Sequence, residues 1–142
     1  DTQNQTDTRG VAIHRVGIRD IKYPFTFRNE GLPDQVLTAS FDATVSLSAD
    51  LKGTHMSRFV EVLRKHLKQP IDLDDVDDIL KDLLTRLESE TATLKMKFSL
   101  FIEKRAPVSG ESSLMDYEVI CDATRSGGQI QKKLVMTIPV TT

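Results

Sequence analysis

The sequence is poor in cysteine and in large aromatic residues: its 142 residues include one cysteine, no tryptophan and two tyrosines. The single cysteine, Cys121, cannot form a disulfide within the chain. Nothing in the cysteine usage indicates an oxidising compartment, so we expect a cytoplasmic protein. No apolar run approaches the roughly 20 residues that a membrane span requires. We therefore expect no membrane partner.

The chain also lacks an excess of positive charge, because 19 Lys and Arg residues face 21 Asp and Glu residues. A dedicated nucleic-acid-binding domain is usually basic, so we expect no nucleic-acid partner. The basic residues of the segment 15–28 and of the segment 64–68 have no aromatic residues interleaved as a stacking platform would need, and they read as a solvated surface.

Alternating polarity predicts strands in five places. Residues 1–10 contain no apolar residue and are expected to form a disordered arm. Residues 37–48 alternate strictly between apolar and polar side chains, which is typical of a strand with one buried face. The segments 11–28, 93–103, 115–123 and 130–140 show similar patterns. A change of parity between Ile18 and Ile21 predicts a bulge or bend. Pro24 indicates that the first strand lies at an edge or is kinked there, and Gly127-Gly128 predicts a hairpin.

Two segments have helical periodicity instead. The first follows Gly53, with Thr54 or Ser57 as its cap, and ends before Pro70. The second begins at Asp72, which is a good N-cap residue. Their apolar stripes contain Met56, Phe59, Val60, Leu63 and Leu67 in the first and Leu73, Val76, Leu80, Leu83 and Leu87 in the second.

The order of elements is therefore β-β-α-α-β-β-β over a single domain, residues 11–142. Hairpins and a helix pair, rather than alternating strands and helices, predict an α+β fold: an antiparallel sheet with two helices on one face. Such a sheet has two open edges unless it associates.

Candidate metal sites within the chain are weak. The acidic cluster at residues 72–78 lacks the glycine and the glutamate of a calcium loop, so it reads as a capped helix start. The histidines His14, His55 and His66 and the lone cysteine show no ligand spacing. We read His66 as a surface residue and Cys121 as a small core residue.

The most suggestive segment for function joins a strand to a helix. It reads Gly53-Thr54-His55-Met56-Ser57-Arg58-Phe59. The start of a helix offers free N–H groups to an anion, and Arg58 adds a permanent charge that can pair with phosphate. A polar connection of this kind is also a common helix cap, and the spacing alone does not decide between the two readings.

The same segment resembles the matching part of the type IB GTP cyclohydrolases, a prokaryotic family. Other pieces agree with this family in order along the chain. They are Val16-Gly17-Ile18, Tyr23-Pro24-Phe25, the segment 104–109, the segment 114–117, and the segment 138–142, which resembles the lead-in to a Cys-Pro-Cys motif. The resemblance covers nearly the whole chain after Gly10.

This resemblance implies a tunnelling fold, in which units assemble into homo-oligomers through their sheet edges, and a place in pterin and folate biosynthesis. The implied reaction converts GTP and water to 7,8-dihydroneopterin triphosphate and formate, with a divalent metal (zinc or manganese-like) that supplies hydroxide. The metal ligands of the family lie beyond Thr142, so we expect this chain to be the N-terminal half of a longer enzyme and to be inactive alone. Residue by residue, the resemblance carries over His55, Ser57 and Arg58 as residues close to the substrate.

Two other functions remain open at this point. The same sheet can serve as a non-catalytic oligomeric module, and the tunnelling fold also occurs in other enzymes of the pterin and queuosine pathways. The fold alone does not separate these alternatives.

Overall fold

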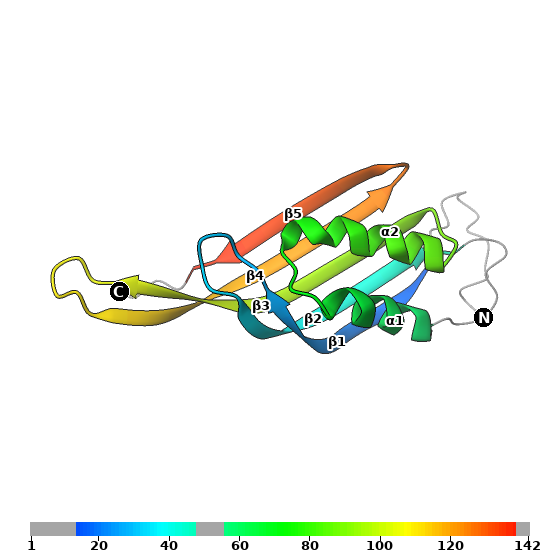
Figure 1. Ribbon diagram of the computed structural model, residues 1–142. Helices are drawn as coiled ribbons and strands as arrows, with labels where there is room; N and C mark the ends of the chain where they lie inside the picture. The colour runs from blue at the N-terminus through cyan, green and yellow to red at the C-terminus, as the bar shows by residue number, and fades with distance from the viewer. Residues whose placement is uncertain (1–13, 48–55, 139–142) are drawn as a thin grey trace.

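The computed structural model describes residues 14–47 and 56–138 of the chain. In this part, five strands form one antiparallel sheet, and two helices lie side by side on one of its faces (Figure 1). Strand order in the sheet follows the chain, so each strand pairs with the next one. The elements are β1 (Arg15–Phe27), β2 (Gln35–Ser46), α1 (Met56–Leu67), the 3-10 helix η2 (Leu73–Asp75), α2 (Val76–Arg86), β3 (Thr91–Arg105), β4 (Ser112–Ser126) and β5 (Gln129–Thr137).

The α+β class, the antiparallel sheet and the helix pair are confirmed, but the element order differs from the predicted one because η2 precedes α2. The side chain of Asp72 accepts hydrogen bonds from the backbone N–H groups of Asp74 and Asp75, and Asp75 in turn accepts from the N–H of Asp72. This capping box holds the first turn in the tighter 3-10 form, and α2 starts only at Val76. The predicted arm, residues 1–10, lies outside the described residues.

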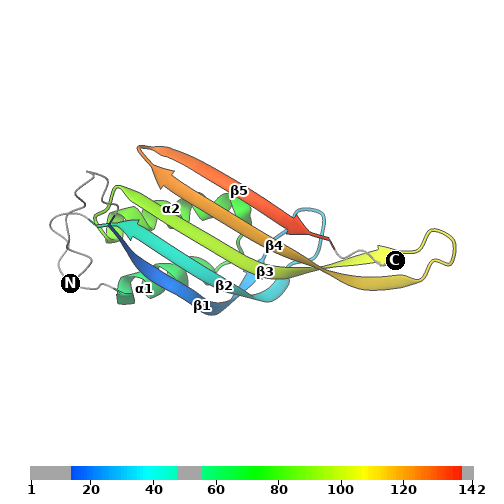
Figure 2. The ribbon, with the colours of Figure 1, turned by 180° about the vertical axis from the view of Figure 1, so that it is seen from behind.

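The two faces of the sheet differ in polarity. Alternate residues of β2, β3 and β4 point toward the helices and are buried, among them Phe41, Leu94 and Cys121. The residues between them point to the other face, which neither helix covers (Figure 2). We call this uncovered side the open face. Period-two alternation thus produces one buried face and one polar face, as the sequence predicts.

Four phenylalanines form a cluster within the core. The ring of Phe98 lies 5.3 Å from that of Phe25 and 5.1 Å from that of Phe27, and Phe41 lies 6.3 Å from Phe25. The Phe25 ring meets Phe41 and Phe98 edge-to-face, a favoured aromatic arrangement. These contacts join β1, β2 and β3 without polar atoms in the core.

Helix α1 buries a different stripe from the one predicted. Phe59, Leu63 and Leu67 are buried as expected, but Met56 is exposed and Val60 is only partly buried, while Val62 is fully buried. The reason is that α1 packs against both β1 and α2, so its buried stripe is turned toward the second helix. A two-sided contact of this kind is not visible in the periodicity of one helix.

The bulge predicted in β1 is present. The register against β2 shifts between Ile18 and Ile21, and Asp20 has a φ of 55°. The backbone N–H of Asp20, which the bulge removes from the ladder, donates to the side chain of Asp42 at 2.8 Å. Next to the bulge, Gly17 lies so close to β2 that an added Cβ would stand 1.9 Å from the carbonyl oxygen of Ala43.

The prediction of a strand over residues 130–140 is wrong in part. The turn Gly127-Gly128 has φ values of 59° and 77°, which suit the predicted hairpin. The strand ends at Thr137, so Ile138 lies beyond it and Val140 is outside the described residues. Leu134 and Met136 pair with core positions of β4 but are almost half exposed, since α2 packs on β3 and β4. The apolar pattern of β5 is therefore not matched by burial within this chain.

The hairpin of β3 and β4 extends well past the other strands (Figure 1). Where β2 parts from β3, the side-chain amide of Gln35 continues the ladder. Its Nε2 donates to the carbonyl of Phe101 at 2.6 Å, and its Oε1 accepts from the N–H of Phe101 at 3.0 Å. Beyond that point the hairpin stands without further strands beside it.

The connection between the helices is fastened to the end of β1. The N–H of Arg28 donates to the carbonyl of Ile71, and the guanidinium of Arg28 contacts Asp72 at 3.0 Å and Asp75 at 3.1 Å. Burial raises the pKa of the Asp72 carboxyl, but the hydrogen bonds from Arg28 and from two backbone N–H groups outweigh it and hold that pKa below its usual value. Within the described residues, no helix has the length and apolar character needed to cross a membrane.

We predict that replacing Asp72 by Asn destabilises the protein at neutral pH and that the loss shrinks in acid. A depressed carboxyl pKa adds stability above the unfolded pKa of about 3.9, and this is lost as the pH falls through the folded pKa. Asn still caps a helix, so the variant removes mainly the charge. Urea unfolding from pH 7 to pH 2.5 measures the difference. Asp74→Asn, at a side chain that is 98% exposed, should change stability little at any pH; a loss for Asp72→Asn that is the same at all pH values would contradict the prediction.

We also predict that Gly17→Ala destabilises the protein by about 1–3 kcal/mol, because the new methyl group overpacks the β1–β2 contact. Gly31→Asn provides the control. Gly31 has a φ of 83°, which Asn tolerates, and a Cβ added there would meet none of the described strands or helices within 4 Å. Thermal unfolding followed by circular dichroism compares the two. Equal midpoints for wild type and Gly17→Ala would show that β1 can move away from β2 at no cost.

Candidate functional site

The segment that the sequence analysis singled out is described only in part. Gly53, Thr54 and His55 lie outside the described residues, and α1 begins at Met56. Ser57 is the second residue of the helix and is exposed, so it does not cap the helix start, in contrast to one of the two predicted caps. The structure therefore places Ser57 and Arg58 in the first turn of α1.

Arg58 lies across the end of the neighbouring helix. Its Nη1 donates to the backbone carbonyl of Arg86, the last residue of α2, at 3.0 Å, and the group is partly buried. Arg86 in turn donates to Glu61 on α1 at 2.6 Å. A cation is favoured at the carbonyl end of a helix. One hydrogen bond uses one of the five N–H donors of a guanidinium, which leaves Arg58 able to bind a further acceptor.

His66, predicted as a surface residue, is only partly exposed. Its Nε2 lies 2.9 Å from Oδ2 of Asp82 on α2, and its side chain is 20% exposed. Burial alone would raise the pKa of the Asp82 carboxyl. The hydrogen bond with His66 and the charge of Lys65 outweigh this effect and hold the pKa below its usual value. This contact joins the two helices, so we assign His66 to helix packing.

Cys121 is a core residue, as predicted. It is fully buried on the helix side of β4, and burial raises the pKa of its thiol. A thiol with a raised pKa is a poor nucleophile and a poor metal ligand, since both roles use the thiolate. Across residues 14–47 and 56–138, no three His, Cys, Asp or Glu side chains converge as a metal site would require. The described residues do not fit a bound metal.

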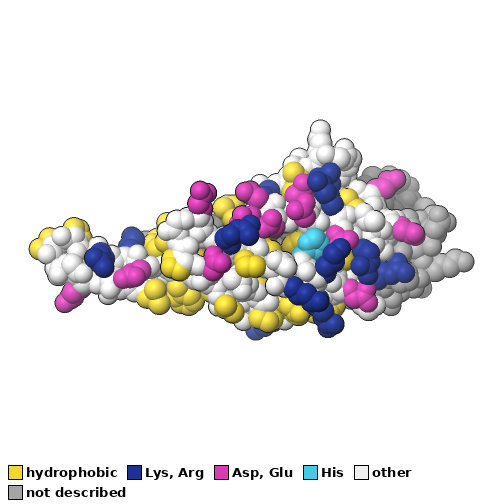
Figure 3. All heavy atoms as spheres, viewed as in Figure 1, with side chains coloured by type: hydrophobic (Ala, Val, Ile, Leu, Met, Phe, Trp, Pro, Cys, Tyr) yellow, Lys and Arg dark blue, Asp and Glu magenta, His cyan; other side chains and the backbone are white. Residues whose placement is uncertain are grey.

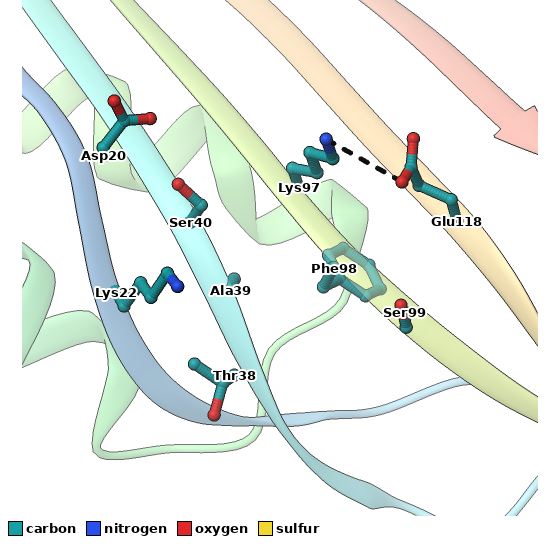
Figure 4. Close-up of a pocket in the computed structure, with 9 residues that line it drawn as sticks. All are labelled: Asp20, Lys22, Thr38, Ala39, Ser40, Lys97, Phe98, Ser99 and Glu118. Carbon is teal, nitrogen blue, oxygen red and sulfur yellow. Dashed lines mark ion pairs between the residues drawn. The ribbon is translucent and has the colours of Figure 1, made fainter.

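A polar hollow on the open face was missed by the sequence analysis. It crosses β1 to β4, and Figure 4 shows Lys22, Ser40, Lys97 and Glu118 around it. In register, Lys22 is opposite Ser40 and Ser40 is opposite Lys97. The only signal in the sequence is that each residue occupies a polar-face position of its strand. Which strands are neighbours, and in which register, appears only in the fold.

Charge is distributed unevenly over the open face. One cross-strand row alternates in sign, from Asp42 through Lys95 and Asp122 to Lys133. In the adjacent row, the register partners of Lys97 are Ser40 and Ile120, both uncharged. The nearest carboxylate, Glu118, is 3.8 Å away, and both side chains of this pair are about half exposed. On the other side of the molecule, basic and acidic side chains are intermingled over the helices (Figure 3).

The known proteins to which this chain is similar belong to one family. A family model described as "Type I GTP cyclohydrolase folE2" matches residues 1–142. The chain is 41% identical over 141 residues to "GTP cyclohydrolase FolE2 2" of Dechloromonas aromatica, covering 99% of this chain and 52% of that protein. It is 43% identical to "GTP cyclohydrolase FolE2" of Methylococcus capsulatus, with the same coverage, and 38% identical to that of Halorhodospira halophila, over 100% of this chain and 54% of the relative. The chain spans about half the length of the curated relatives it matches.

We predict that Cys121 is chemically inert in the native protein. Because it is buried and its pKa is raised, iodoacetamide at pH 8 should leave it unlabelled until urea is added. Peptide mass mapping identifies the Cys121 peptide whatever other thiols are present. Labelling of this peptide in native buffer at the rate of a free thiol would show that the sheet opens there or that Cys121 has a chemical role.

Proposed function

Because the chain belongs to the type I GTP cyclohydrolase FolE2 family, we propose that the protein containing it converts GTP and water to 7,8-dihydroneopterin triphosphate and formate. The observation that carries the proposal is the identity of about 40% to proteins of that name, sustained over nearly every residue of the chain. Since those relatives are about twice as long, the proposed activity is that of the whole protein rather than of these 142 residues.

Within this chain, we assign the substrate-facing role to His55, Ser57 and Arg58. Ser57 and Arg58 lie in the first turn of α1, where backbone N–H groups have no partner within the helix. Arg58 is already oriented by the carbonyl of Arg86, so its guanidinium is held in place before any substrate arrives. A fixed guanidinium suits the triphosphate, because planar N–H pairs match phosphate oxygens. We propose that Arg58 binds the triphosphate and that His55 orients the purine or a reacting water.

The proposed reaction also requires a divalent metal, for which we propose zinc or a manganese-like ion. When bound, such an ion supplies hydroxide at neutral pH. The described residues offer no ligand set for it, and Cys121 is buried in the sheet. From the family resemblance we propose that the ligands lie beyond Thr142, and we assign no step of the reaction to the described residues through the metal.

Assembly is a further part of the proposal, together with a cytoplasmic location, membership of the type IB group and a tunnelling fold. Both β1 and β5 are edge strands of the sheet. On β5, Leu134, Val135 and Met136 are 40–49% exposed, which is unusual for an edge that stays in water. We propose that these edges pair with further strands in a homo-oligomer. This support also fits the alternative in which the sheet serves assembly alone.

We predict that Arg58→Ala raises the KM for GTP of the whole, metal-loaded protein about tenfold or more, because a charged hydrogen bond to phosphate is lost. Arg58→Lys keeps the charge but loses the planar pair of donors, so its KM should lie between the two. Release of formate from GTP measures turnover. Arg64→Ala is the matched control, since Arg64 is exposed on the same helix. Circular dichroism checks that loss of the Arg58–Arg86 contact leaves the helices folded.

Two results would separate errors in this proposal. If kcat/KM of a folded Arg58→Ala protein and of His55→Ala equals that of the wild type, the assigned site is wrong while the reaction stands. If the whole metal-loaded protein releases no formate from GTP, the reaction itself is wrong. The assembly module and the other tunnelling-fold reactions then take its place.

A further inference from the structure

We propose that the open face of the sheet carries a binding site for a phosphate group, centred on Ser40 and formed by the ammonium groups of Lys22 and Lys97. This site is separate from Arg58, which lies in the helix layer on the other side of the sheet. The existence of the site does not depend on the proposed reaction, whereas the identification of its ligand by the KM for GTP does. The bound group is a phosphate of a polyphosphate chain, either free in solution or as the tail of a nucleotide.

The three side chains of the proposed site form one cross-strand row. Lys22, Ser40 and Lys97 lie directly opposite one another on β1, β2 and β3. Neighbouring strands are about 4.8 Å apart, so the two lysine backbones are separated by about 10 Å with the serine between them. Each lysine side chain is long enough to reach the middle of this gap, and Lys97, whose ammonium is turned toward Glu118 in this structure (Figure 4), must rotate to do so. The hydroxyl of Ser40 and the nearby hydroxyls of Thr38 and Ser99 add neutral donors to the same hollow.

The charges around this row differ from those of the neighbouring row. The neighbouring row of the face pairs each lysine with carboxylates, since Lys95 lies between Asp42 and Asp122. Lys22 and Lys97 share only Ser40 as a cross-strand partner. Two positive charges on either side of a hydroxyl repel each other weakly, and an anion placed between them removes this repulsion. The row therefore favours an anion in a way that the alternating row does not.

Two carboxylates at the rim restrict where the anion sits. Asp20 and Glu118 line opposite ends of the hollow, so the phosphate must lie over Ser40 rather than at either end. Glu118 competes for Lys97, but at 3.8 Å and half exposed this ion pair is weak and can open. Removing the carboxylate of Glu118 should therefore strengthen anion binding, the opposite of what removing either lysine does.

Titration calorimetry with inorganic tripolyphosphate on the whole protein tests the site. Because Arg58 is itself proposed to bind a triphosphate, the lysine variants are compared in an Arg58→Ala background. There we expect Lys22→Gln and Lys97→Gln each to weaken binding about tenfold. Glu118→Gln should tighten it. Lys95→Gln is the matched control, because it removes the same charge from the same face of β3 one row away, and it should leave the affinity unchanged. Binding must also persist in Arg58→Ala, which tests independence from the helix layer.

Some results would overturn the proposed site, and others would identify its ligand. If Lys22→Gln and Lys97→Gln both bind as tightly as their Arg58→Ala parent, there is no site on the open face and the proposal is overturned. An equal loss in Lys95→Gln also overturns it, because it shows only diffuse charge. No detectable binding of tripolyphosphate to wild type also overturns it. If the site is present, the KM for GTP identifies its ligand. A KM raised by Lys22→Gln indicates the nucleotide tail, whereas an unchanged KM indicates a free polyphosphate.

Discussion

The rest of the structure depends on the burial of one sheet face under two helices. Strands β2, β3 and β4 alternate, so half of their side chains leave water together, and α1 and α2 are the only described elements available to cover them. This requirement fixes the connection between the helices as well. It is held against the end of β1 by the Phe27–Ile71 bridge and by the contacts of Arg28 with Asp72 and Asp75. With one face covered in this way, the opposite face stays free to carry polar groups and charge.

Local patterns in the sequence were sufficient wherever a feature is determined by neighbouring residues. The bulge in β1 follows from the change of parity between Ile18 and Ile21, and the β4–β5 turn follows from Gly127-Gly128. The capping role of Asp72 was also visible. Such features depend on backbone geometry over a few residues, which the side chains at those positions largely set.

The features that the sequence could not reveal all depend on a distant partner. The burial of Val62 arises because α1 meets α2 as well as β1, and the exposure of Leu134 arises because the helices stop short of β5. In the candidate site, the sequence and its family resemblance singled out Ser57 and Arg58, but the contact of Arg58 with the carbonyl of Arg86 joins residues 28 positions apart. The pairing of Lys22 with Ser40 and Lys97 likewise requires strand order and register, which single-strand periodicity does not contain.

The sheet also separates the two places where we propose that this chain holds an anion. Arg58 lies in the helix layer, and Lys22 and Lys97 lie on the opposite face, with the apolar core between. No anion can lie within that core, because burying a charge without a partner has a large free-energy cost. One phosphate group within a single chain therefore binds at one of these places and not at both. If one nucleotide contacts both kinds of residue, the open face of one copy must lie next to the helix layer of another, and binding is then coupled to the way that the exposed β1 and β5 edges are paired.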